Sequence, residues 1–247
     1  MNVLNYRHIR TIIQKYRPQT VFHLAALTGV RASLRKPQTY FITNVIGTKN
    51  VYLATVSIKG SKFIFTSSSS VYGNSSQIPF LETQELKPLS PYAKSKFEAE
   101  ILLKKLRIKA KIPTTILRLF SVYGPFGRPD MAPYLFTQAA FSGKEIDIFG
   151  DGQIARDYTY IDDIVSGTII TLDADLAYAV MNIGGDKEEK LTRFIEVIEE
   201  NLGKKAKKKM MPMQPGDVQS TVADIRKLRK LGWRPTTRIE VGIKNFV

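Results

Sequence analysis

The sequence predicts an α/β fold of the doubly wound type, with a parallel β-sheet at its centre. Three short runs rich in β-branched and aromatic residues occur in the first half of the 247-residue chain, and helical patterns separate them. Strands that alternate with helices indicate βαβ units, whose strands run parallel. We expect the strands at residues 20–24, 62–66 and 114–119.

The expected helices lie before and between these strands. One covers about Asn44 to Ser57, and another runs from about Pro91, a residue suited to a helix start, to Ile108. Ahead of the first strand, residues 5–17 predict a further helix, with four apolar side chains on one face. These are Tyr6, Ile9, Ile12 and Ile13.

The character of the sequence changes after Phe120, where a loop rich in glycine and proline covers residues 123–129. Mixed elements follow to the end of the chain. We therefore expect one region at residues 1–122 and a second, smaller region at residues 123–247. In the second region, apolar residues at helical spacing predict a packed amphipathic helix. They are Leu191, Phe194, Ile195, Ile198 and Leu202.

Composition excludes several kinds of chemistry. The chain has no cysteine, and its only histidines are His8 and His23, so disulfides, thiolate nucleophiles and histidine metal clusters are excluded. Catalysis must use hydroxyls, carboxylates, amines or a cofactor. The sequence has neither an apolar run long enough to span a membrane nor a signal peptide, so we expect a cytoplasmic protein.

The net charge of +15 raises the possibility of nucleic-acid binding. The one dense basic run comprises Lys204, Lys205, Lys207, Lys208 and Lys209, just after an expected helix end at Gly203. No aromatic residue lies within it to stack on bases. We therefore expect a solvated loop and no nucleic-acid partner, with a binding patch as the alternative.

Tyr92 and Lys96 form the strongest local signal for catalysis. Residues four apart lie on one face of a helix, so the two side chains can share a site. A nearby ammonium favours the phenolate, which makes the tyrosine a better base at neutral pH. Alone, however, the pair is more often a chance feature of a helix surface.

A cluster of hydroxyls at a strand end strengthens this interpretation. Residues 66–70 read Thr-Ser-Ser-Ser-Ser directly after the second expected strand. Open parallel sheets bind ligands at the carboxyl ends of their strands. Alone, the serine run is more simply explained as a polar loop. Followed by Tyr-x-x-x-Lys on the next helix, it forms a combination far more specific than either feature alone.

From residue 20 onward the chain resembles an extended short-chain dehydrogenase/reductase of the NAD-dependent epimerase/dehydratase type. Four segments resemble the family's motifs and occur in the family's order: residues 23–26, 44–50, 123–125 and 156–163. Within the family the resemblance is greatest to UDP-glucuronate 4-epimerases. The segments that carry it are residues 29–33, 67–73, 127–131 and 210–218.

The resemblance implies a partial Rossmann-type NAD-binding domain at residues 1–122. It also implies a mainly substrate-binding region at residues 123–247, from which about 157–184 returns to the Rossmann part. Ser68, Tyr92 and Lys96 would be catalytic, and NAD would be the cofactor. Tyr92 and Lys96 would also contact NAD, together with Leu24, Ala25, Ala26 and Asn44.

For the substrate, the resemblance implies a UDP-sugar, most naturally UDP-glucuronate, epimerised at carbon 4 through a transient ketone. Neutral serines stand where dehydratases and decarboxylases of the family carry an acid, which favours epimerisation. A UDP-hexose is the alternative substrate. The implied substrate-binding residues are Ser69, Ser70, Ser121, Arg128, Arg156 and Asp217, with Arg31 a weaker candidate.

A Rossmann half opens with a strand, a glycine-rich turn and an acid about twenty residues later, and none of these precedes His23. We therefore expect roughly 60 residues, about two βαβ units, to be absent from the amino end. Three interpretations stay open: an epimerase whose start lies upstream, a truncated product that at most binds UDP-sugar, and a partner of a full-length relative. With the missing part present, relatives of this type imply a homodimer through the helices at 44–57 and 91–108.

Overall fold

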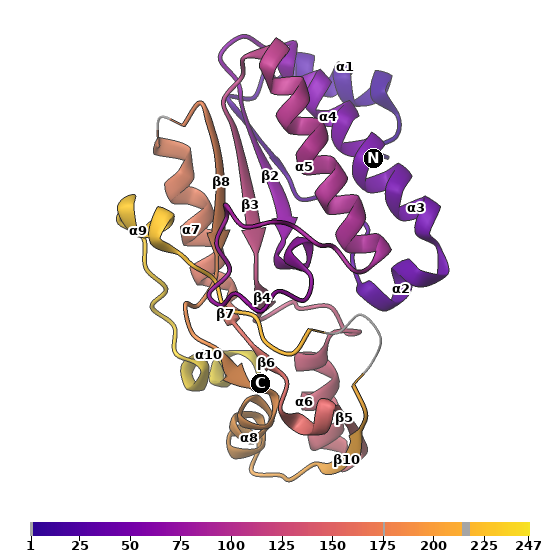
Figure 1. Cartoon of the computed structure of the whole chain (residues 1–247), viewed down its shortest axis with the longest axis vertical. Helices are drawn as coiled ribbons and strands as arrows, with labels where there is room; N and C mark the ends of the chain where they lie inside the picture. Colours follow the sequence, from indigo (N-terminus) through magenta and orange to yellow (C-terminus); the bar gives the residue numbers. More distant parts are fainter. Residues whose placement is uncertain (1, 175, 214–217) are drawn as a thin grey trace. The chain divides into compact units, whose positions relative to one another are not determined.

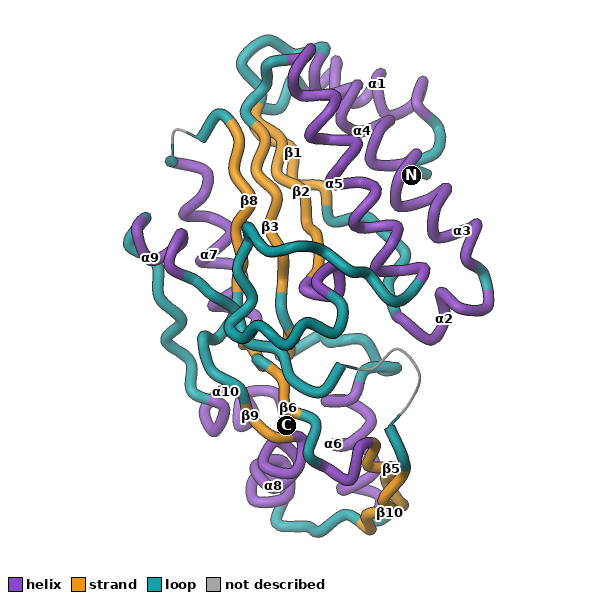
Figure 2. Tube along the Cα trace, viewed as in Figure 1, coloured by secondary structure: helices purple, strands orange, loops and turns teal. Residues whose placement is uncertain are grey.

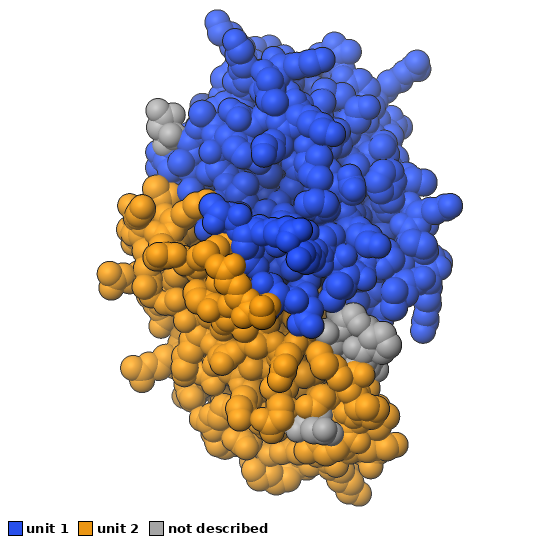
Figure 3. Space-filling model, in the orientation of Figure 1, with its two compact units in different colours: residues 1–75, 82–119, 170–181 blue, residues 76–81, 120–169, 182–247 orange. Residues whose placement is uncertain are grey.

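The computed structural model describes residues 2–174, 176–213 and 218–247. The chain divides into two compact units, coloured separately in Figure 3. The first unit contains residues 1–75, 82–119 and 170–181, and the second contains residues 76–81, 120–169 and 182–247.

The first unit is built on a sheet of strand order β1-β2-β3-β8. β1 (Thr20–His23), β2 (Lys62–Ser68) and β3 (Thr114–Leu119) pair in parallel, with Val21 opposite Phe63 and Phe63 opposite Thr114. These are the three strands expected from the sequence. β8 (Tyr178–Ile183) adds the fourth position, and the strands lie side by side in Figure 2.

Helices cover this sheet, and α1, α4 and α5 lie together on one side of it in Figure 1. The bounds are α1 (Tyr6–Tyr16), α2 (Val30–Arg35), α3 (Pro37–Phe41), the π-helical segment η1 (Ile42–Ile46), α4 (Gly47–Val56) and α5 (Pro91–Ala110). The helix expected from Asn44 thus continues a helical run that begins at Pro37. Two helix starts are capped: the Asn5 side chain accepts from the His8 amide, and the Ser90 side chain accepts from the Ala93 amide.

The core of the first unit fixes α5 against β2. Phe63 and Phe65 of β2 are buried in one cluster with side chains of α1, α4, α5 and β3. Tyr52 of α4 meets Phe63 edge to face, with ring centroids 5.0 Å apart. Ala99 and Leu103 bring α5 into the same cluster. The helix that carries Tyr92 and Lys96 is therefore anchored to the strand that ends in the serines.

Among its described residues, the second unit contains three small strand pairs and four complete α-helices. The pairs are β4 (Ser121–Tyr123) with β7 (Tyr158–Tyr160), β5 (Glu145–Phe149) with β10 (Lys207–Met211), and β6 (Ala155–Arg156) with β9 (Glu189–Lys190). The helices are α6 (Ala132–Ser142), α8 (Leu191–Leu202), α9 (Arg226–Lys230) and α10 (Ile239–Phe246). A further helix, α7 (Ile161–Asp173), begins in this unit and ends in the first.

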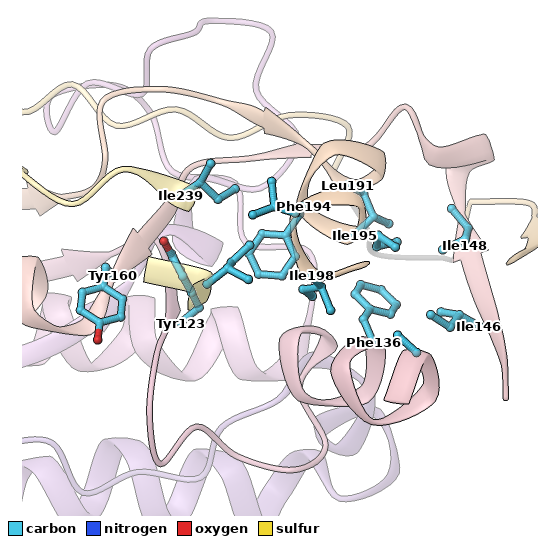
Figure 4. Close-up of a cluster of buried hydrophobic side chains, with 13 residues drawn as sticks. Tyr123, Phe136, Ile146, Ile148, Tyr160, Leu191, Phe194, Ile195, Ile198 and Ile239 are labelled. Carbon is cyan, nitrogen blue, oxygen red and sulfur yellow. The ribbon is translucent and has the colours of Figure 1, made fainter. Parts of the chain in front are cut away.

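The predicted amphipathic helix is confirmed as α8, and it forms the centre of the second unit's core (Figure 4). Phe194 lies 4.2 Å from the Tyr158 ring in a stacked arrangement and 5.5 Å from the Tyr123 ring in an edge-on one. Ile195 and Ile198 are fully buried in the same cluster.

The lysine run corrects an expectation, because part of it is a strand rather than a loop. α8 ends at Gly203, which has a left-handed backbone, and residues 207–211 then form β10. Lys207 lies opposite Glu145, and Lys209 lies opposite Asp147 on β5. Opposite charges placed across a strand pair offset the poor strand propensity of lysine.

A buried carboxylate, that of Glu199, binds two lysines of the same run. Glu199 of α8 accepts from the Ala206 amide at 2.9 Å and lies 3.1 Å from the Lys205 ammonium and 3.0 Å from the Lys208 ammonium. Glu199 therefore offsets part of the positive charge of Lys205 and Lys208. In the parts of the chain that the structure describes, no helix has the length and apolar character needed to cross a bilayer.

Candidate active site

The serine segment begins where β2 ends. Ser68 is the last residue of the strand, and residues 69–72 form the short 3-10 helix η2. The Ser68 hydroxyl accepts from the Ser70 amide at 3.2 Å and bonds the Ser70 hydroxyl at 3.1 Å. Ser68, Ser69 and Ser70 are half-buried at the end of the strand.

Gly73 closes this segment in a conformation that only glycine fits. Its φ is +66°, and a Cβ there would lie 1.8 Å from the Lys87 carbonyl oxygen. The residues after η2 therefore turn sharply against the backbone at Lys87.

Lys96 reaches the same strand from α5. Its ammonium donates to the Thr66 carbonyl at 2.6 Å and lies 4.8 Å from the centre of the Phe65 ring. The side chain is 3% exposed. The Lys96 ammonium is thereby held at Thr66, two residues before Ser68 on β2.

Tyr92 lies one helical turn before Lys96, in the first turn of α5. Its ring is half-buried and meets Tyr40 edge to face at 6.4 Å. α5 packs against both β2 and η2. Tyr92, Lys96 and the serine segment therefore belong to one packed substructure of the first unit.

Burial shapes the charge at this site. Burial lowers the pKa of Lys96 to about 8, against the opposing attraction of the Glu100 carboxylate. His23 lies nearby on β1, and burial together with the Lys96 charge lowers its pKa to about 4. At neutral pH Lys96 is therefore mostly protonated, while His23 is neutral.

The loop after β1 is held by Asn44. Its amide oxygen accepts from the Leu27 amide at 2.8 Å, and its amide nitrogen donates to the Leu27 carbonyl at 2.9 Å and the Ser95 hydroxyl at 2.8 Å. Ser95 in turn donates to the Tyr92 carbonyl. Asn44 therefore links the loop that contains Leu24, Ala25 and Ala26 to the start of α5.

This loop is open to solvent at its beginning. Leu24 is 64% exposed, Ala25 is also exposed, and Ala26 is half-buried. His23, directly before them, is buried, and its Nε2 lies 2.9 Å from the Thr48 hydroxyl. The backbone of Leu24 and Ala25 is thus presented at the carboxyl end of β1, where ligands bind open parallel sheets.

Sequence reasoning missed a buried ion pair behind the serines. Arg118 of β3 donates from Nε to one oxygen of Glu100 at 3.1 Å and from Nη2 to the other at 2.7 Å. The Ser67 hydroxyl also donates to Glu100. One signal was available in the sequence: Glu100 follows Tyr92 and Lys96 at a further step of four on α5.

The remaining predicted substrate residues are distributed as follows. Arg31 is exposed on α2 of the first unit. In the second unit, the amide of the half-buried Ser121 donates to the Asp157 carbonyl, and Arg128 forms a bidentate ion pair with Asp130. Arg156 donates from Nη1 to the Ala155 carbonyl at 2.8 Å. Asp217 lies outside the described residues.

Asp157 is a second residue that sequence reasoning missed. Its buried carboxylate accepts from the Ala223 amide at 2.9 Å, the Asp186 amide at 3.2 Å and the Thr159 hydroxyl at 3.0 Å, and also from the Gly185 amide. Burial raises its pKa to about 6. Asp157 therefore joins three backbone segments of the second unit and has a structural role.

Comparison with known proteins assigns the chain to a family. Residues 1–246 match the family described as GDP-mannose 4,6 dehydratase. The chain belongs to this family, as the resemblance to extended short-chain dehydrogenases/reductases predicts. A UDP-glucuronate 4-epimerase of Thermodesulfobacterium geofontis is 41% identical over 250 residues, which cover the whole of this chain and 77% of that protein.

Solved structures agree with this assignment. A UDP-glucose 4-epimerase of Thermotoga maritima, crystallised with UDP-glucose, superposes with a TM-score of 0.95 at 30% identity, over the whole of this chain and 81% of the other. A UDP-glucuronic acid 4-epimerase of Bacillus cereus, solved with UDP-glucuronic acid and NAD, gives a TM-score of 0.93 at 37% identity, over the whole of this chain and 78% of the other. The Rossmann-type fold is thereby confirmed.

The described residues fit one side of an NAD site. The groups that would hold NAD are the open backbone at Leu24 and Ala25, on the adenosine and ribose side of the cofactor, and the buried Lys96 amine. A pyrophosphate cradle requires a glycine-rich turn, and the 247 residues contain no Gly-x-Gly-x-x-Gly sequence. The usual pyrophosphate-binding glycines therefore have no counterpart in these residues.

Proposed function

We propose that this chain carries the catalytic and sugar-binding part of an NAD-dependent UDP-sugar 4-epimerase, with UDP-glucuronate as substrate and UDP-galacturonate as product. The observation that carries the proposal is the hydrogen bond from Lys96 to Thr66, which anchors the Tyr-x-x-x-Lys helix beside the serine segment. The similar UDP-glucuronate and UDP-glucose 4-epimerases, one of them solved with NAD, support the proposal.

In this proposal Ser68 binds the 4-hydroxyl of the sugar and Tyr92 accepts its proton. Lys96, one turn away, stabilises the phenolate through its positive charge. Leu24, Ala25, Ala26, Asn44, Tyr92 and Lys96 would hold NAD, whose chemistry would be to take the hydride from carbon 4 of the sugar and give it back to the other face of the resulting ketone. Tyr92 returns the proton at the end of the reaction, so only the configuration changes.

The serines also support a uronate substrate. A 4-keto uronate is a β-keto acid and loses carbon dioxide when the bond between its carboxylate and carbon 5 aligns with the carbonyl. Neutral donors such as Ser69 and Ser70 can hold the carboxylate in another orientation, and Ser121 of the second unit is a further proposed donor. Of the remaining proposed substrate residues, Arg31, Arg128 and Arg156 suit a diphosphate or a carboxylate, because guanidinium groups bind both in bidentate fashion. Asp217 completes the proposed set.

Two alternatives remain to be distinguished by experiment. The first is a UDP-hexose 4-epimerase, which the Thermotoga maritima relative favours. The second is a catalytically inactive chain that at most binds UDP-sugar or a full-length relative. The open loop after β1, with Leu24 64% exposed, favours this second alternative for the 247-residue chain by itself.

The deciding experiment is a product assay. The 247-residue chain, and the same chain fused behind the amino-terminal segment of the Thermodesulfobacterium geofontis relative, are each incubated with UDP-glucuronate and with UDP-glucose. Faster conversion of UDP-glucuronate by the fusion supports the uronate assignment. Equal conversion of both sugars would indicate a UDP-hexose epimerase, and no conversion by the fusion would favour the inactive alternative.

We also propose a cytoplasmic homodimer that pairs through the helices at 44–57 and 91–108. Three apolar side chains just before or at the start of the first of these helices are at least 39% exposed: Phe41, Ile42 and Ile46. Exposed apolar side chains on one helical segment are typical of a contact surface. Light scattering of the fusion, with and without Ile46→Lys, tests the dimer.

A further inference from the structure

The ion pair behind the serine segment is almost completely removed from solvent. The Arg118 and Glu100 side chains are 5% and 6% exposed, and both oxygens of the carboxylate are engaged by the guanidinium. Burying two charges costs more than a surface pair gains, and apolar replacements of similar volume are often as stable. Bulk stability alone is therefore a weak explanation for the pair.

The pair contacts the chain on both sides of the proposed sugar-binding serines. Before them, the Ser67 hydroxyl donates to Glu100. After them, Arg118 donates from Nη1 to the Tyr72 hydroxyl at 2.9 Å, and its guanidinium lies 4.9 Å from the Tyr72 ring centre. Ser68, Ser69 and Ser70 are thus held between two fixed points.

The same face of α5 also binds β2 at Thr66, one residue before Ser67. Lys96 donates to the Thr66 carbonyl, and Glu100, one turn later on α5, accepts from Ser67. Two consecutive residues of β2 are therefore bound by two consecutive turns of α5. Any shift of the helix along the strand would break both contacts together.

From these contacts we infer that Glu100 and Arg118 are positioning residues for the active site. They fix Ser68–Ser70 against the helix that carries Tyr92 and Lys96, and Arg118 pairs with the Glu100 carboxylate one helical turn after Lys96. The functional meaning rests on the proposed epimerase chemistry, in which the charge on Lys96 assists Tyr92. The positioning of the serines and the effect of Glu100 on Lys96 can be tested without assuming that chemistry.

The charge on Lys96 is influenced by the titratable groups around it. Glu100 comes from α5, His23 from β1 and Tyr92 from the preceding turn, and Arg118 of β3 is the partner of Glu100. Burial keeps His23 neutral at pH 7. The carboxylate of Glu100, partly compensated by Arg118, is therefore the charge through which this network acts on Lys96.

The first test is a titration of Lys96 in the 247-residue chain. Lysine labelled with ¹³C at Cε is followed by NMR against pH, and the Lys96 signal is assigned by its loss in Lys96→Met. Glu100→Gln should lower the Lys96 midpoint by about one pH unit, and Arg118→Met should raise it by a similar amount because the carboxylate loses its compensating charge. Tyr72→Phe removes a contact but no charge, and should leave the midpoint unchanged.

Shifts in opposite directions are a signature that general loosening of the fold would not produce, since loosening moves every variant toward the midpoint of a solvated lysine. Shifts of the same sign in Glu100→Gln and Arg118→Met, or no shift in either, would overturn the electrostatic role. If Arg118→Met does not fold, Glu100→Gln decides by itself, and an unchanged or raised Lys96 midpoint in that variant would overturn the electrostatic role.

The second test addresses positioning through hydrogen exchange. Ser67→Ala removes only the contact before the serines and should speed exchange of the amides at 68–72 by roughly tenfold, with little change at residues 63–65. Unchanged exchange at 68–72, or equal acceleration along the whole strand, would contradict local positioning. UDP-glucuronate binding to the same variants forms a separate arm: absence of binding to the unmodified chain would count against the proposed function alone, because the titration and exchange results do not depend on it.

Discussion

The ammonium of Lys96 donates a hydrogen bond to the carbonyl of Thr66, two residues before the end of β2 at Ser68. This contact brings a helix-borne Tyr-x-x-x-Lys pair to a strand end rich in hydroxyls. The same arrangement explains why the pKa of Lys96 is lowered, since the amine reaches the strand only by leaving water. Each of the following predictions tests one part of this first unit.

Retention of NAD should depend on a glycine-rich segment that the 247 residues do not contain. We expect the purified chain to carry little NAD, and the fusion with a relative's amino-terminal segment to carry about one equivalent. The cofactor is released by acid or heat and measured by its absorbance after enzymatic reduction. Stoichiometric NAD in the 247-residue chain would refute this expectation.

His23 should make the fold sensitive to mild acid. Its pKa is about 4 in the folded chain and about 6.5 when solvated, so below pH 6.5 the unfolded state takes up a proton that the folded state does not. This stabilisation is fully present above pH 6.5 and is lost as the pH falls toward 4, and at pH 4 the loss amounts to about 3 kcal/mol.

The matching measurement is urea unfolding of the unmodified chain and of His23→Gln at pH 7 and pH 4.5. The variant cannot titrate in this window and should lose less stability between the two pH values. His8→Gln, at an exposed position of α1, serves as the control and should behave as the unmodified chain. Equal losses in the unmodified chain and His23→Gln would show that His23 does not set this dependence.

Gly73 should resist replacement because of where its Cβ would fall. Both Gly73 and Gly60 have positive φ, but a Cβ at Gly60 meets nothing within 4 Å, whereas at Gly73 it would lie 1.8 Å from a carbonyl oxygen. We expect Gly60→Ala to cost about 1 kcal/mol and Gly73→Ala at least about 3 kcal/mol. Thermal unfolding of the two variants compares them directly, and similar losses would mean that the turn after η2 can relax.

The fold was largely predictable because its signals are local. The strands at 20–24, 62–66 and 114–119 and the helix at 191–202 each follow from apolar spacing and turn residues within a short window. β10 was not predictable in this way, since its lysines form a strand only through pairing with Glu145 and Asp147 some sixty residues earlier.

The same distinction applies to the site. Tyr92 and Lys96 were visible as a pair because both lie on one helix. Arg118 was not, since an arginine within an apolar strand has no local signal for a partner on α5. For Asn44, the sequence could not reveal that its side chain links the loop at Leu27 to the Ser95 hydroxyl.

Replacement of the proposed base tests the central claim most directly. Turnover of UDP-glucuronate to UDP-galacturonate is measured in the fusion protein with Tyr92→Phe, with Tyr134→Phe on α6 as the control. The account predicts that Tyr92→Phe loses turnover by about 10²- to 10⁴-fold with sugar binding largely kept, while the control retains both. Near-normal turnover in Tyr92→Phe would contradict it.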